Sequence, residues 1–423
     1  MIVVKCIEKI KDNKGVIKQY KIKDSQCNEK VVTAQQLKQA IKNGQVCCSN
    51  LKLTSDNRLV GNIEEHVDIE KKLIKIRALG KTEFEYDNMT FVVKGENILL
   101  KSVNIENGTI TLPSFMTGYM RQSPDKVGMY SPFEKCVKIK VINKSQITIM
   151  THLFQYTVNL EEIDLSDFNA SKITSLRQAF RCSTVKRVHF GKFNTEQVTD
   201  MSGLFESCEN LVSADISKFN TKNVISMIRT FSNTGLKSID LSNWDMRKVI
   251  DITYMFENSI VEKIKMGTTS SALRTMWGTF SQCIFLSSID LSKLNTQGVD
   301  NMCKLFTSCT ALKKLDLSNF SVEKVLTMDN MFSYCGSIKE LDLSSFYTIR
   351  LNNMSEMFLA CEKLKVINMD NFCTQGIKSC GRLFWKCKSL TSIVATRKFI
   401  MPAVKKQITE VLKSNTNQYD RHL

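Results

Sequence analysis

The sequence predicts an α/β solenoid of about ten strand–helix repeats of 25–26 residues, preceded by a small α+β module. Two observations predict this fold class. An apolar–x–apolar triplet that begins at Ile163 returns every 25 or 26 residues as far as Ile393. A phenylalanine recurs every 24 to 26 residues from Phe154 to Phe384. Regular self-similarity of this length is typical of repeat proteins, in which each unit buries its apolar side against its neighbours.

Residues 1–62 predict a separate basic ββαββ module. Its expected elements are strands at residues 2–11 and 16–23, a helix that Thr33 caps and Asn43-Gly44 ends, and a second hairpin at residues 46–54 and 58–60. The module holds 12 Lys or Arg against 5 Asp or Glu, a net charge of +7. Its candidate basic patch is formed by Lys5, Lys9, Lys11, Lys14, Lys18, Lys21 and Lys23 on the first hairpin.

The segments around the repeats predict a connector and two caps. Residues 63–81 are charged and amphipathic, which favours a helical connector. Residues 82–135 contain β-rich runs and are expected to cap the solenoid at its N-terminal end, because an exposed end repeat needs a polar cover. Residues 136–396 form the solenoid itself. Residues 397–423 are expected to supply a C-terminal capping helix, from Pro402 to Leu412, and a tail.

One repeat shows why a strand and a helix are expected. At the end of residues 312–318 the apolar positions alternate with polar ones, as in a half-buried strand. Further apolar residues follow with spacings of three, three, one and three, which places them on one face of a helix. They are Val325, Met328, Met331, Phe332 and Cys335.

This unit resembles the BspA-type leucine-rich repeat, which is named after a bacterial surface antigen. The pattern Leu312-x-x-Leu315-Asp316-Leu317-Ser318-x-Phe320 followed by Val325-x-x-Met328-x-x-Met331-Phe332-x-x-Cys335 carries the resemblance, which covers roughly residues 136–396. The resemblance implies a protein-binding module, and many members of that family are adhesins with signal peptides or anchors. The N-terminus has no apolar run of secretory length, and no stretch of about 18 apolar residues occurs. We therefore expect a cytoplasmic protein, while the resemblance also admits a surface or exported location.

Cysteine and methionine each occupy a fixed repeat position, which indicates core packing. No CxxC pair suggests a zinc or redox site, so we expect the column cysteines to be reduced and buried. These cysteines are Cys208, Cys283, Cys309, Cys335, Cys361 and Cys387. The methionines of the equivalent column are Met201, Met227, Met276, Met302, Met328 and Met354. Nucleotide-binding and hydrolase motifs are missing from the sequence. We expect no enzyme, cofactor or metal.

The surface expected to carry function is the strand face, which is concave in leucine-rich solenoids. The residue between the two apolar positions of each triplet points outward there. The candidate binding residues are Asp164, Asp215, Asp240, Lys265, Asp290, Asp316 and Asp342. Two interpretations stay open: the aspartates bond locally to the backbone or to neighbouring repeats, or they line a mildly acidic ligand groove. Both count against nucleic acid on this face.

The sequence thus predicts a non-enzymatic scaffold that binds an unidentified protein through its solenoid. The alternative is a nucleic-acid-associated protein that contacts phosphates through the basic N-terminal module. The total charge of +17 gives this alternative limited support, because the long segment of residues 136–396 carries only +7, spread over its length.

Overall fold

A computed structural model of the chain describes ten stretches and divides the chain into two compact units. The units are Met1–Thr82 and Glu83–Leu423. The described stretches are residues 2–11, 17–24, 29–42, 46–48, 52–53, 59–60, 82–120, 131–145, 147–395 and 400–419. The predicted connector at residues 63–81 lies outside the described residues.

The first unit contains a four-stranded mixed sheet and one helix. Its elements are β1 (Ile2–Lys11), β2 (Ile17–Asp24), β3 (Glu29–Thr33), α1 (Ala34–Lys42), β4 (Val46–Cys48), β5 (Lys52–Leu53) and β6 (Leu59–Val60). The sheet order is β3-β2-β1-β4, with β4 parallel to β1, and β5 pairs with β6. Strand β3 was not predicted. Its five residues form a strand through pairing with β2, and this pairing is not visible in their own sequence pattern.

Helix α1 begins at the predicted cap. The Gln36 backbone N–H donates to the Thr33 hydroxyl at 3.2 Å, and the Thr33 N–H donates to the Gln36 side chain at 2.9 Å. This reciprocal pair is a capping box, which satisfies two N–H groups that the first helical turn leaves free. Leu37, in the same turn, is buried.

The second unit opens with a small β-sheet that precedes the solenoid. Strands β7 (Glu83–Tyr86), β8 (Met89–Lys94), β9 (Asn97–Val103) and β11 (Gly118–Tyr119) form it in the order β11-β9-β8-β7. Strand β10 (Asn107–Leu112) instead pairs in parallel with β12 (Lys138–Asn143). The parallel ladder therefore begins one strand before residue 136.

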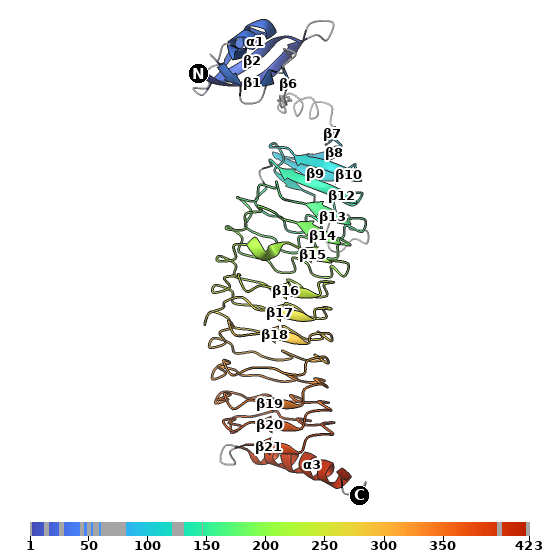
Figure 1. Cartoon of the computed structure of the whole chain (residues 1–423), viewed down its shortest axis with the longest axis vertical. Helices are drawn as coiled ribbons and strands as arrows, with labels where there is room; N and C mark the ends of the chain where they lie inside the picture. Colours follow the sequence, from blue (N-terminus) through green and yellow to red (C-terminus); the bar gives the residue numbers. More distant parts are fainter. Residues whose placement is uncertain are drawn as a thin grey trace. The chain divides into compact units, whose positions relative to one another are not determined.

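The strands of the solenoid stack in parallel, one for nearly every turn, and each turn is called a rung below (Figure 1). They are β13 (Glu162–Asp164), β14 (Arg187–His189), β15 (Ser213–Ala214), β16 (Ser238–Asp240), β17 (Lys263–Lys265), β18 (Ser288–Asp290), β19 (Glu340–Asp342), β20 (Val366–Asn368) and β21 (Ser392–Val394). Three ladders result: β10-β12-β13-β14-β15, β16-β17-β18 and β19-β20-β21. Ile239, Ile264 and Ile289 are paired neighbours. The predicted strand at Leu315 is wrong, since no ladder includes that rung.

The predicted helix in each repeat is also wrong. Within the described residues the helices are α1, α3 (Pro402–Tyr419) and a short 3-10 turn, η1 (Ile216–Lys218). The second half of each rung is instead a run of tight turns, and several of its residues have positive φ, such as Glu356 at 56° and Ala360 at 57°.

Hydrogen bonds between rungs explain why turns replace the helix. The N–H groups of Met354, Glu356 and Phe358 donate to carbonyls of the next rung at 2.9, 2.8 and 3.1 Å. Between them, the N–H of Met357 donates to the carbonyl of Met354 within its own turn, at 3.3 Å. In a helix, all of these N–H groups would donate to carbonyls of the same segment. Here alternate groups tie each rung to its neighbour, so the backbone is satisfied without a helix.

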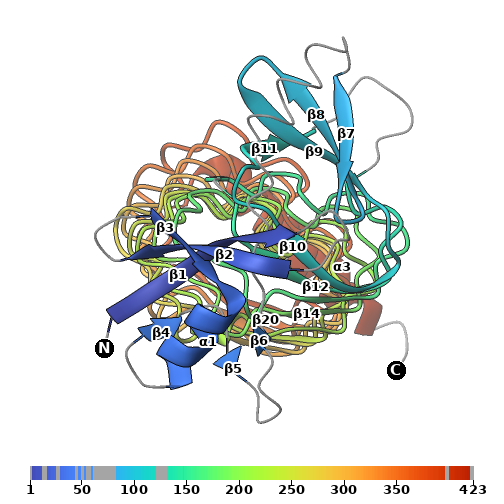
Figure 2. The same cartoon turned by 90° about the horizontal axis from the view of Figure 1, so that it is seen from above.

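A column of phenylalanine rings runs through the centre of the solenoid. Neighbouring rings from Phe154 to Phe384 lie 5.0–6.1 Å apart between centroids. Seen from above, the rungs overlie one another as nested loops (Figure 2). The predicted methionine column is buried throughout, which confirms that it fills the core. Aromatic rings at this spacing add stacking contacts to the burial of apolar surface.

The predicted cysteine column is buried as well, and its thiols take part in the rung contacts. The Cys335 thiol donates to the Phe306 carbonyl at 3.1 Å, and the Cys283 thiol donates to that of Phe256 at 3.0 Å. Serine or threonine takes this position in four rungs, and in one of them the Ser259 hydroxyl donates to the Phe231 carbonyl at 2.6 Å. The position therefore accepts a small side chain, which can donate to the rung before it.

We predict that the column thiols resist labelling in the native protein. Burial raises the pKa of Cys283 and of Cys335 to about 12, which leaves little thiolate at neutral pH. A small maleimide followed by mass mapping should label few column cysteines in the folded protein and nearly all 15 cysteines in denaturant. Rapid native labelling of Cys309, Cys335 and Cys361 would contradict the buried column.

Candidate binding surface

The predicted binding residues lie on the strand face, which is the surface formed by the outward residues of the rung strands. Asp164 is half-buried there, and Asp215, Asp240, Lys265, Asp290, Asp316 and Asp342 are exposed. The strands place them because residues of alternate positions point to opposite faces. The inner residues on either side of Asp240, which are Ile239 and Leu241, are buried.

Most of these aspartates accept a hydrogen bond from the backbone two residues later. The Ser242 N–H donates to Asp240 at 2.9 Å, the Ser318 N–H donates to Asp316 at 3.0 Å, and Asp164, Asp290 and Asp342 repeat the pattern. Bonding to Ser242 lowers the pKa of Asp240 to about 2, since it favours the charged carboxylate. The aspartates therefore close the turn that follows each strand, as the local interpretation expects.

The structure brings some members of this set together and separates others. Lys265 pairs with Asp240 of the preceding rung, with 3.2 Å between nitrogen and oxygen. The Asp215 carboxylate instead reaches the preceding rung, where the N–H groups of Phe190 and Gly191 donate to it at 2.5 and 3.2 Å. Asp164 lies 3.6 Å from the Lys140 ammonium. These contacts tie rungs together.

Asp316 and Asp342 line a shared hollow. This acidic groove has a volume of about 660 Å³ and lies where the strand ladder is interrupted. Its lining comprises Ser287, Ser288, Ile289, Lys314, Leu315, Asp316, Glu340, Leu341, Asp342, Val366 and Asn368. The groove therefore spans four rungs around the one at Leu315.

The interruption exposes part of the apolar core on the floor of the acidic groove. Ile289 and Leu315 are half-buried, whereas Ile264 and Leu341, the inner residues of paired strands, are only 2% and 3% exposed. Three carboxylates surround this floor against one ammonium, that of Lys314. The combination suits a segment that presents an apolar side chain between basic ones.

Sequence reasoning identified two of the groove residues and missed the others. Glu340 belongs to the strand column that precedes the aspartates, and Ile289 and Leu315 were assigned to the core. No local signal marks the interruption, because residues 312–318 follow the same apolar pattern as their neighbours. It appears only when the rungs are stacked.

The candidate basic patch falls on the first unit. Lys5, Lys9 and Lys11 lie on β1, and Lys18, Lys21 and Lys23 lie on β2, with Lys5 directly opposite Lys23. Lys14 lies outside the described residues. In the part of the chain that the structure describes, no group of three or more His, Cys, Asp or Glu is arranged to hold a metal ion.

Comparisons with known proteins identify a family and solved structures that resemble the chain. No curated protein matches the chain. The crystal structure of the T. pallidum leucine rich repeat protein is similar at 13% identity and a TM-score of 0.21, over 78% of this chain and 95% of that one. No helix in the described residues has the length and apolar character needed to cross a membrane.

A family model matches most of the solenoid. Its three matches cover residues 127–190, 174–283 and 271–396 and overlap one another, so that together they span more than half of the 423 residues. The chain belongs to the family described as "Mycoplasma protein of unknown function, DUF285".

Proposed function

We propose that this chain is a non-enzymatic scaffold for protein–protein interaction, and that it binds its partner on the strand face at the acidic groove. The observation that supports this best is the interrupted ladder at Leu315, which leaves a half-buried apolar floor among exposed carboxylates. Stacked rungs provide a long rigid surface, and such surfaces serve repeat proteins in binding.

The chemistry of the acidic groove defines the partner. Asp316, Glu340 and Asp342 carry three negative charges, so the partner segment is basic. Ile289 and Leu315 offer a shallow apolar contact, so the segment also carries an exposed apolar residue.

Affinity capture from the native cell with matched charge reversals tests this proposal. The variant carries Asp316→Lys and Asp342→Lys, and the control carries Asp240→Lys together with Asp164→Lys on intact ladders. All four aspartates accept the same N–H bond from two residues later, so both variants lose equivalent turn bonds, and the control also loses the ion pairs of Asp164 with Lys140 and of Asp240 with Lys265. We expect the groove variant to lose its specific partner and the control to retain it.

Once the partner is identified, its affinity for the groove variant is compared with its affinity for the control. Because each reversal places like charges together across the interface, we expect the purified partner to bind the groove variant at least about tenfold more weakly than the control. Equal loss in both variants, or in neither, would overturn the assignment to the acidic groove.

The nucleic-acid alternative is favoured by the lysines that pair across β1 and β2. Lys5 opposes Lys23, which concentrates charge on this hairpin. If this alternative holds, binding to duplex DNA will weaken steeply with salt. Replacing Lys5, Lys21 and Lys23 by glutamine will then reduce the slope of that dependence by about one for each of these lysines that neutralises a phosphate. The charge reversals in the acidic groove would leave DNA binding unchanged.

We also propose that the protein resides in a reducing compartment, the cytoplasm. Within the described residues, eleven cysteines are free thiols, and six of them form the buried column. Oxidising compartments favour disulfides, so a free column of this kind suits a reducing one. The resemblance to the BspA-type repeat supports the same protein-binding role and admits a surface location, which fractionation of the native cell distinguishes.

A further inference from the structure

Within the turns, the hydrogen bonds between rungs run in one direction, toward the following rung, whereas a residue just before each turn, such as Leu326, donates to the preceding rung. In an interior rung the N–H groups of Met302, Lys304, Phe306 and Ser308 donate to carbonyls of the following rung at 2.7–3.0 Å. The same pattern recurs from rung to rung. A stack with this polarity therefore exposes a row of carbonyl acceptors on its first rung and a row of N–H donors on its last rung.

The start of the stack is closed by hydroxyl groups from the cap. The Tyr119 hydroxyl donates to the Thr151 carbonyl at 2.7 Å, and the Ser131 hydroxyl donates to the Leu153 carbonyl at 2.8 Å. These are the acceptors that a preceding rung would otherwise use. The N-terminal cap therefore removes the exposed acceptor row.

The finish of the stack is closed only in part. Helix α3 places Asn415, whose amide donates to the Cys387 and Leu390 carbonyls at 2.8 Å each. Its Gln407 bonds the Cys380 carbonyl and the Leu383 N–H, at 2.8 and 2.9 Å. No described residue accepts from the N–H groups that continue the rung pattern. These groups belong to Arg382, Phe384 and Lys386.

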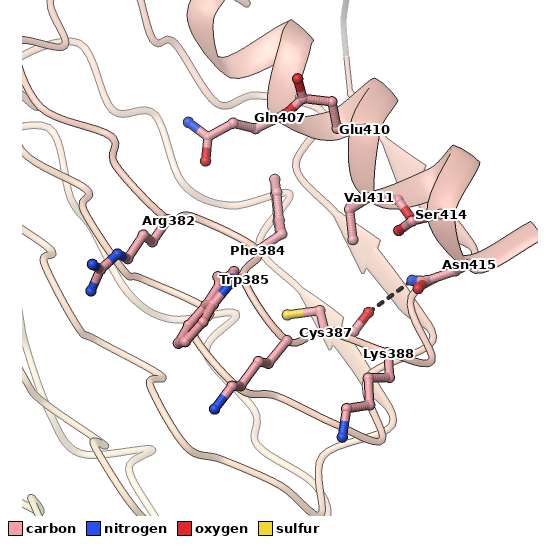
Figure 3. A pocket seen from close by; sticks show the side chains of 11 residues that line it. Arg382, Phe384, Trp385, Cys387, Lys388, Gln407, Glu410, Val411, Ser414 and Asn415 are labelled. Atoms are coloured by element: carbon pink, nitrogen blue, oxygen red, sulfur yellow. Dashed lines mark hydrogen bonds between the residues drawn. The ribbon is translucent and has the colours of Figure 1, made fainter. Parts of the chain in front are cut away.

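A cavity of about 590 Å³ opens beside this donor row, between the last rung and α3. Figure 3 shows Gln407, Glu410 and Ser414 on the helix across the space from Arg382 and Trp385. Trp385 is 50% exposed, and Lys386 stacks over its ring with the ammonium 4.5 Å from the centroid. The cavity is thus bordered by backbone N–H donors on one side and by the aromatic ring of Trp385 with the cationic Lys386 at its rim.

Charge on this end of the chain is strongly one-sided. Residues 378–419 hold nine Lys or Arg and a single acidic residue, Glu410. Arg382 and Lys388 each form an ion pair with a glutamate of the preceding rung, at 3.4 and 3.3 Å, and both basic side chains remain exposed. An anionic ligand is therefore favoured over a cationic or neutral one.

We propose that this end of the solenoid, the C-terminal edge formed by Arg382, Phe384, Lys386 and α3, binds an extended acidic peptide. Carbonyls at alternate positions of the peptide accept from the alternate N–H groups of the last rung, as in strand addition to a sheet edge. Acidic side chains of the peptide meet Lys386 and Lys388, and an apolar one lies against Trp385. This site is separate from the acidic groove and prefers the opposite charge.

Fluorescence anisotropy with the full-length chain tests the preference. The probes are labelled peptides of alternating valine and glutamate or valine and lysine, and a short oligothymidylate. We expect the acidic peptide alone to bind, with an affinity that falls as salt rises. Stronger binding of the lysine peptide or of the oligothymidylate would overturn the proposal.

Two matched charge reversals locate the site. Lys386→Glu and Lys304→Glu change the charge equally, at turn positions with φ of 64° and 55°, and Glu356 already occupies such a position at 56°. We expect Lys386→Glu to weaken acidic-peptide binding about tenfold and Lys304→Glu to change it less than about twofold. Equal effects would place the peptide elsewhere.

Hydrogen exchange tests the backbone contacts directly. Without peptide, the amides of Arg382, Phe384 and Lys386 should exchange faster than those of the equivalent Lys304, Phe306 and Ser308, which donate to the next rung. Saturating acidic peptide should slow exchange at residues 380–388 only. Binding without that protection would show that the donor row is not used and would overturn the proposed mode.

Discussion

Replacing Phe332 with alanine is expected to lower the free energy of unfolding by about 3–5 kcal/mol. The ring is fully buried and lies between Phe306 and Phe358, with centroids 5.8 and 5.7 Å away and planes within 7° and 4° of parallel. Alanine removes the ring and leaves a cavity that a backbone tied to both neighbouring rungs cannot close. The damage should spread to the adjacent rungs, since each stabilises the next.

Urea denaturation followed by circular dichroism measures this loss. Tyr334, two residues further along the same turn and 47% exposed, supplies the control. Tyr334→Ala should change stability by no more than about 1 kcal/mol. A Phe332→Ala protein as stable as the control would refute the ring column.

Gly298→Ala is expected to cost about 3 kcal/mol for a different reason, overpacking. A methyl group on Gly298 would meet the Ser271 carbonyl oxygen at 2.2 Å and that of Leu273 at 2.5 Å. Both are backbone atoms of the preceding rung, so no side chain can turn away to relieve the clash. The rungs would have to separate, which weakens the bonds between them.

Gly336→Ala is the matched control for this substitution. A methyl group there would have no atom within 4 Å. We expect Gly336→Ala to leave stability unchanged or to raise it by about 0.4–1 kcal/mol, because alanine restricts the unfolded chain. Equal melting temperatures for the two variants would contradict the close approach of rungs at Gly298.

The core of the solenoid could be predicted from the sequence, but its backbone conformation could not. Met328, Met331, Phe332 and Cys335 are all buried, as the spacing indicated. The same spacing suits a helix face and a run of tight turns, because each returns a side chain inward about every third or fourth residue. The two conformations differ in where alternate N–H groups donate. In the solenoid they donate to carbonyls of the next rung, as the N–H of Phe332 does to the carbonyl of Met357, 25 positions away.

The candidate site was predictable to a similar extent. The outward aspartates could be placed because strands alternate, and their turn-closing role follows from the serine two residues later, as in Asp316 and Ser318. The acidic groove could not be predicted, since Leu315 and Leu341 have the same local surroundings in sequence. Their different exposure depends on the pairing of neighbouring rungs.

The polarity of the hydrogen bonds between the turns of successive rungs has a consequence for synthesis on the ribosome. Each new rung brings the carbonyls that its predecessor's N–H groups require, so the growing stack is completed from the N-terminus in the order in which it is made. The N-terminal cap, with Tyr119 and Ser131, precedes the first rung and is ready when that rung emerges. A nascent chain therefore always presents a donor edge at its newest rung, and a chain truncated there would keep that edge and be prone to aggregate through it.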